Sequence, residues 1–180
     1  MKTPKNVYKR FIEFEERAAG LYLQLASRFV DDARLSSFWL DMALEEKRHA
    51  GLLQFCLREE LFAVSLPNIA EMQRLGILFK RLEKQAQTRD LSPKDAFTLA
   101  IELEYSEMNA IYCHLTTPVH SSTYLLKRKI ATFMPNHLSA LVAAARKFVG
   151  DGAIKELERL KKRCSAQWRG SRDDERRRAG

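Results

Sequence analysis

The stretch LDMALEEKRHAGLL, residues 40–53, places two polar side chains on a helical face that should be apolar. A helix turns about 100° per residue, so Glu46 and His49, three residues apart, lie on the same face. Met42 and Leu53 continue that face at steps of four residues. We therefore expect a carboxylate and an imidazole to point together into the protein core.

The bulk composition is typical of one helical domain. Of the 180 residues, 46% are hydrophobic and 30% are charged, with only 7 glycines and 5 prolines. No apolar run approaches the roughly 18 residues of a membrane span, and the polar N-terminal stretch lacks a secretory signal. We expect a cytoplasmic protein with no membrane partner. The 3 cysteines are far apart, which predicts neither a disulfide framework nor a thiolate metal site.

Apolar residues at three- and four-residue steps predict an all-α fold. Ser92 and Asp95 form a capping pair at the start of one helix. Two hairpins joined by a helical crossover make a four-helix bundle, which we assign to residues 1–150. We expect residues 151–180 to form a short amphipathic helix and a basic, disordered tail. The predicted segments of the bundle are residues 4–30, 35–62, 67–90 (the crossover), 92–117 and 121–150.

The basic charge is concentrated near the C-terminus. The net charge is +8, and much of the excess lies after residue 154. A basic tail can attach electrostatically to nucleic acid, but acidic residues interrupt this one. We therefore do not expect nucleic acid as a partner.

The two halves of the chain resemble each other. FIEFEERAAGLYLQL (11–25) aligns with AIELEYSEMNAIYCHL (100–115) if one residue is inserted, which matches Glu15 to Glu104. Farther along, His49 corresponds to His137, while Glu46 corresponds to Met134. The second half is an altered copy of the first.

Further carboxylates fall on the inward stripes of the predicted helices. Glu15 shares a stripe with Phe11, and Glu104 and Glu107 are three residues apart. Burying carboxylates without partners costs several kcal/mol each, and iron, manganese and zinc accept carboxylate and imidazole ligands together. We therefore expect a metal in the core.

Other interpretations of the same residues stay open. Glu16 replaces Glu15 on the inward side if the helical phase is off by one residue. Because the EEKRH stretch, residues 45–49, is charged throughout, Glu46 and His49 are also compatible with a pair that faces solvent. Glu107 is also compatible with an ion pair to Lys127 or Arg128 from the last helix of the bundle.

The chain resembles the ferritin-like superfamily, most closely the rubrerythrin-type di-iron domain, over about residues 7–149. The resemblance rests on EERAAGLY, EEKRH and EYSEM, which contain Glu15, Tyr22, Glu46, His49, Glu104 and Glu107. It implies two irons per chain, with manganese or zinc as alternatives, and Tyr22 beside the ligands. It also implies a homodimer, an unidentified electron donor, and redox chemistry of a peroxidase or ferroxidase with dioxygen or peroxide.

One departure from the family pattern leaves two interpretations. The family's fourth-helix glutamate falls on Met134, Pro135 should kink the helix there, and the thiolate electron-transfer module is missing. In the first interpretation Glu107 replaces the lost ligand and Glu46 bridges an asymmetric di-iron site. In the second, the bundle is degenerate, holds one metal or none, and acts as a structural or interaction protein.

The two interpretations use different ligand sets. We favour the first, because drift should remove buried carboxylates that no metal neutralises. Its first metal is bound by Glu15 and His49, and its second by Glu104, Glu107 and His137. The second interpretation retains only Glu15, Glu46 and His49, with or without Glu104.

Overall fold

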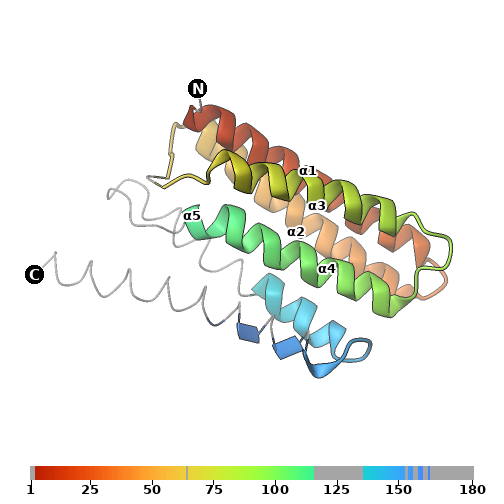
Figure 1. The fold of residues 1–180 in the computed structure, drawn as a ribbon. Helices are drawn as coiled ribbons and strands as arrows, with labels where there is room; N and C mark the ends of the chain where they lie inside the picture. Colours follow the sequence, from red (N-terminus) through yellow and green to blue (C-terminus); the bar gives the residue numbers. More distant parts are fainter. Residues whose placement is uncertain are drawn as a thin grey trace, which may run out of the picture.

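The computed structural model describes residues 3–63, 65–115, 136–152, 154–155, 158–159 and 162, and all regular secondary structure among them is helical. The helices lie alongside one another (Figure 1). The expectation of an all-α chain is thus confirmed for the described residues. Met134, Pro135 and nearly all of the basic tail lie outside them. The elements are α1 (Pro4–Arg28), α2 (Ala33–Arg58), α3 (Ile69–Ala86), α4 (Pro93–Glu107), the π-helix η1 (Met108–Tyr112) and α5 (Cys113–Leu115), followed by helical residues 136–145.

The hairpin of α1 and α2 is fixed by capping at its turn. Asp32 caps α2 by accepting hydrogen bonds from the backbone amides of Arg34 and Leu35. The Ser36 hydroxyl donates to the Ala26 carbonyl at 2.9 Å, which ties the start of α2 to the end of α1. The two helices are therefore antiparallel neighbours, as the sequence predicted.

The C-terminal end of α2 was predicted four residues too late. The helix ends at Arg58 rather than near Phe62, because Glu60 adopts a φ of 54°. The Leu61 amide then donates to the Cys56 carbonyl at 2.9 Å, a Schellman-type termination. A glutamate at this left-handed position carries no sequence signal, since glycine is the residue expected there.

Helix α3, in the segment predicted as the crossover, is anchored to α1. Arg17 donates two hydrogen bonds to Glu83, from Nε at 2.7 Å and from Nη2 at 2.8 Å. The same guanidinium lies 4.7 Å from the ring centroid of Phe79, and Phe79 stacks on Phe14 of α1. Helix α3 thus covers one side of α1.

The start of α4 has the predicted cap. The Asp95 amide donates to Ser92 Oγ and the Ser92 amide donates to an Asp95 carboxylate oxygen, both at 3.2 Å. Downstream, regular α-geometry stops at Glu107 and gives way to the π-helix η1, which was not predicted.

The core lies between the helices and is rich in aromatic side chains. Trp39 packs against Tyr22, Phe38 and Phe97, and all but Phe38 are fully buried. No helix among the described residues has the length and apolar character needed to cross a membrane.

Candidate metal centre

The structure brings the predicted polar residues into one buried cluster. They come from α1, α2, α4 and the helical segment 136–145, and none is more than 3% exposed. The phase of α1 is settled in favour of Glu15, because Glu16 instead forms a surface ion pair with Lys47. The cluster consists of Glu15, Glu46, His49, Glu104, Glu107 and His137.

Glu46 lies at the middle of this cluster. One of its carboxylate oxygens is 2.9 Å from His49 Nδ1, and the other is 3.1 Å from His137 Nε2. Glu15 lies 3.4 Å from the same His49 nitrogen, and Glu104 lies 2.7 Å from the same His137 nitrogen. Two triads therefore share Glu46, and within each triad the possible ligand atoms all lie within 4.8 Å of one another.

Glu107 is buried beside both triads without belonging to either. Burial raises the pKa of its carboxyl well above the ordinary value, and the charges of Glu15, Glu46 and Glu104 raise it further. Glu15 is the strongest of these electrostatic neighbours. The sequence grouped Glu107 only with Glu104 and His137, whereas the carboxylate that raises its pKa most is Glu15 of α1.

Two tyrosines hold the outer glutamates in a reciprocal arrangement. Tyr22 donates to Glu104 at 2.7 Å, and Tyr112 donates to Glu15 at 2.9 Å. Both tyrosines are buried. Tyr22 thus lies beside the predicted ligands, as expected, and each half of the chain supplies a hydroxyl to the glutamate of the other half. Sequence reasoning missed Tyr112.

The π-helix explains why Tyr112 was missed. Under regular α-helical rotation, Tyr112 would lie about 140° away from Glu107, off the inward face. A π-turn closes its hydrogen bond five residues on instead of four, and η1 spans Met108–Tyr112. The alignment of the two halves needed one inserted residue in this same region. That insertion, which matches Tyr22 to Tyr112, was the available signal.

The protonation of the cluster without a cation is uneven. Burial raises the pKa of Glu15 to about 8. Burial acts in the same direction on Glu46, but the charges of His137 and His49 outweigh it and hold that pKa well below the ordinary value. Burial lowers the pKa of His49, while Glu46 and Glu15 raise it to a net value of about 10. Two imidazolium ions thus compensate part of the carboxylate charge.

Protons alone leave much of the cluster unpaired. Buried polar atoms nearly always have a hydrogen-bond partner in folded proteins. Carboxylate oxygens and imidazole nitrogens gathered in one place could hold a metal ion, and this ligand set suits iron, manganese or zinc. Among the described residues the atoms of the cluster that make no hydrogen bond are Glu15 Oε2, Glu46 Oε1, His49 Nε2, Glu107 Oε1 and His137 Nδ1, although Glu15 Oε2 and Glu46 Oε1 each lie within ion-pair distance of a histidine nitrogen.

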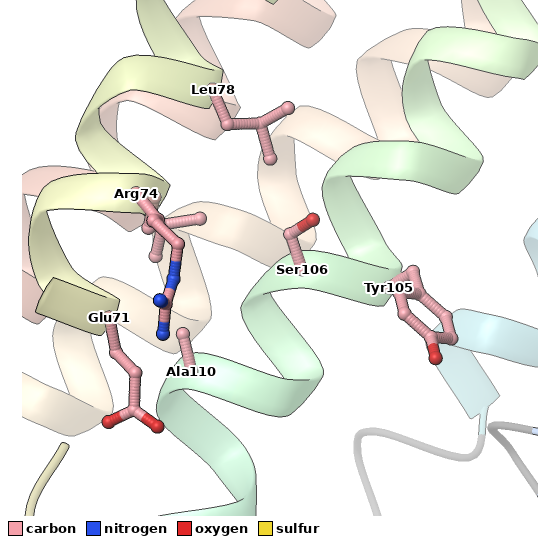
Figure 2. Close-up of a pocket in the computed structure, with 7 residues that line it drawn as sticks. Glu71, Arg74, Leu78, Tyr105, Ser106 and Ala110 are labelled. Carbon is pink, nitrogen blue, oxygen red and sulfur yellow. The ribbon is translucent and has the colours of Figure 1, made fainter.

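Two surface hollows differ in their relation to the cluster. A hollow of about 340 Å³ between α2 and the segment 136–145 has His137 in its lining, together with Asp41, Glu45 and Arg48. A second hollow, of about 330 Å³, lies between α3 and the end of α4, and Figure 2 shows residues that line it. Arg74 and Ser106 line the second hollow, and no residue of the cluster does. The first hollow is therefore the better candidate route to the buried residues.

Comparisons of the chain with models of protein families, with curated proteins and with solved structures found no match in any of the three. The functional assignment therefore depends on the chemistry of the buried cluster.

Proposed function

We propose that the protein is a metal-binding, ferritin-like four-helix bundle with a carboxylate-bridged di-iron site. The observation that carries the proposal is the position of Glu46, whose two oxygens lie 2.9 and 3.1 Å from nitrogens of two different histidines. Di-iron bundles combine glutamates from two helices with Glu-x-x-His motifs from the other two. Glu15, Glu104 and the Glu46–His49 pair fit that pattern, and His137 retains half of the remaining motif.

The charges of the cluster support a dinuclear site. Glu15, Glu46, Glu104 and Glu107 offer four negative charges when ionised, which balances two divalent cations. Glu46 would bind both ions, and the two triads on either side of it would each hold one. Glu107 would supply the carboxylate that is lost where Met134 stands.

The proposed chemistry is reduction of dioxygen or peroxide, or oxidation of iron itself. A bound pair of iron ions supplies the electrons for such reactions. The protein residues hold the ions and control their surroundings. Tyr22 and Tyr112 fix Glu104 and Glu15 through their hydroxyl groups, and the near-complete burial of the cluster excludes bulk water.

The proposal is tested by counting metals. Metal-free protein titrated anaerobically with ferrous iron should bind about two ions per chain. Glu46→Gln keeps the size of the side chain but removes the shared charge, so it should abolish stoichiometric binding. Glu45→Gln is the matched control, because Glu45 pairs with Arg48 at the surface. Equal binding by all three proteins would contradict the proposal.

A degenerate bundle with one metal or none is the second candidate. The observation that favours it is the hydrogen bond of 2.7 Å between His137 and Glu104, because a protonated imidazole there replaces part of a cation's charge. Such a core needs no metal for stability. A degenerate bundle without a metal therefore predicts equal melting temperatures for chelator-treated and iron-treated protein, whereas one with a single metal predicts a higher melting temperature with iron but only about one bound ion per chain. A di-iron site predicts a higher melting temperature together with about two bound ions.

A further inference from the structure

A serine, a histidine and a glutamate from three separate segments meet beside the start of α3. The Ser65 hydroxyl lies 3.0 Å from His114 Nδ1, and His114 Nε2 lies 3.9 Å from an oxygen of Glu71. Ser65 belongs to the loop between α2 and α3, Glu71 to the first turn of α3, and His114 to α5. The buried cluster described above uses none of the three.

The π-helix places His114 outside the core. Under regular α-helical rotation His114 would lie about 20° from Glu107, on the inward face, because the two are seven residues apart. The wider turn of η1 brings Tyr112 onto that face instead. Two residues later the chain has turned about 200° further, and His114 meets Ser65 and Glu71.

The contacts of His114 favour the tautomer in which Nε2 carries the proton. A carboxylate attracts the imidazole N–H, and Glu71 lies on the Nε2 side of the ring. Nδ1 then accepts the hydrogen bond that the Ser65 hydroxyl donates. A hydroxyl within hydrogen-bond reach of a base, with the base oriented by a third group, is the arrangement that activates a nucleophilic serine.

The start of α3 holds Glu71 in position. The Asn68 amide donates to Glu71 Oε2 at 2.6 Å, and the Glu71 amide donates to Asn68 Oδ1 at 2.9 Å. This reciprocal capping box restrains the glutamate side chain. The oxygen that it holds, Oε2, is the one that lies nearest to His114 Nε2.

The three side chains are accessible and adjoin a hollow. The side chain of His114 is 20% exposed and that of Glu71 is 33% exposed, while Ser65 is half-buried. Glu71 also lines the hollow of about 330 Å³, together with the apolar Leu75 and Leu78. Figure 2 shows Glu71 at one end of the labelled residues of α3 and Leu78 at the other. The hollow therefore begins near His114, and its volume suits a small molecule.

We propose that Ser65 is a nucleophile toward small carboxylic esters with an apolar acyl group. His114 is its general base, Glu71 is the residue that positions the base, and the hollow receives the acyl group. This proposal is independent of metal binding by the buried cluster.

The proposed reaction has two steps. In the first, the Ser65 oxygen bonds to the carbonyl carbon of the ester, and the bond from that carbon to the alcohol oxygen breaks. The Ser65 proton passes through His114 Nδ1 to the departing alcohol. In the second, water attacks acyl-Ser65 with the same base, which releases the carboxylic acid and restores the hydroxyl.

The first test measures whether Ser65 is activated. A fluorophosphonate labels serines that a base activates, and mass spectrometry of the digested protein locates the label. We expect label on Ser65 and a labelling rate about a hundredfold lower or more in His114→Gln, because general-base assistance contributes about 10²–10⁴-fold. Ser37→Ala, which alters an exposed serine of α2, is the matched control and should leave the rate unchanged. An unlabelled Ser65, or an unchanged rate in His114→Gln, would overturn the proposal.

The second test measures turnover of p-nitrophenyl acetate. Ser65→Ala should lower kcat about a hundredfold or more. Glu71→Gln should lower kcat about tenfold with little change in KM, because glutamine keeps the capping box but not the charge that orients His114. Circular dichroism and iron titration should be unchanged in both variants, which separates this site from folding and from the buried cluster. Turnover by Ser65→Ala equal to that of the unsubstituted chain, or an undiminished kcat in Glu71→Gln, would contradict the assigned roles.

Discussion

At the scale of single residues, three glutamates of the cluster differ because their neighbours differ. Glu46 lies between two imidazoles, which hold its pKa low. Burial raises the pKa of Glu15 to about 8 although His49 is close. The pKa of Glu107 is raised well above the ordinary value, because its carboxyl is buried and the charges that act on it belong to other carboxylates. Metal binding therefore has to displace protons, mainly from the groups around Glu46 rather than from Glu46 itself.

The tyrosine hydroxyls should tune metal affinity. Tyr112→Phe and Tyr22→Phe each remove a hydrogen bond to a proposed ligand and should weaken iron binding about tenfold to a hundredfold, as measured by competition with a chelator. Tyr8→Phe is the control, because the Tyr8 hydroxyl accepts from the Ala63 amide at 3.0 Å, away from the cluster. An affinity loss for Tyr8→Phe equal to that of the other two variants would contradict a specific role for them.

The stability of the metal-free protein should fall as the pH rises. The pKa of His49 is raised from 6.5 to about 10. Its contribution to the free energy of unfolding is therefore complete below pH 6.5 and is lost as the pH rises through 10. The pKa of Glu15 is raised from 4.5 to about 8. Its contribution to the free energy of unfolding is complete below pH 4.5 and is lost as the pH rises through 8. Together they should lower the free energy of unfolding by several kcal/mol toward pH 10.

Thermal unfolding between pH 5 and pH 10 in a chelator measures this dependence. Iron-loaded protein should lose less stability over the same range, because bound metal replaces the protons. Identical, flat profiles for the two forms would contradict the electrostatic description of the cluster.

At the scale of helices, periodicity predicted the elements but not their irregularities. The capping pair at Ser92 and the burial of Glu46 and His49 follow from local rules and were confirmed. The π-turn before Cys113 and the positive φ of Glu60 were not predicted. The π-turn had one signal, the residue inserted in the alignment of the two halves. The left-handed conformation of Glu60 had none, because glycine is the residue expected there.

The attachment of α3 to α1 should depend on the geometry of one arginine. Arg17→Lys keeps the charge but loses the two-pronged contact with Glu83 and the stacking on Phe79, and should destabilise the fold by about 1 kcal/mol. Denaturant unfolding measures this. Arg48→Lys is the control, because Arg48 is largely exposed and pairs with Glu45 on the same helix. Equal losses in both variants would contradict a specific role for Arg17.

At the scale of the whole molecule, the sequence predicted which residues meet but not how they meet. Residue type, helical phase, the alignment of the two halves and the family resemblance together selected all six members of the cluster, with Glu16 left as an alternative to Glu15. Which oxygen faces which nitrogen, and the proximity of Glu107 to Glu15, depend on how the helices pack.

The central claim is that the cluster binds two metals on either side of Glu46. Anomalous scattering at the iron edge, from crystals soaked anaerobically in ferrous iron, both counts and locates such ions. We predict two peaks roughly 3.5–4 Å apart, one beside His49 and the other beside His137. No peak in the cluster, or a single peak there at full iron loading, would contradict the di-iron site.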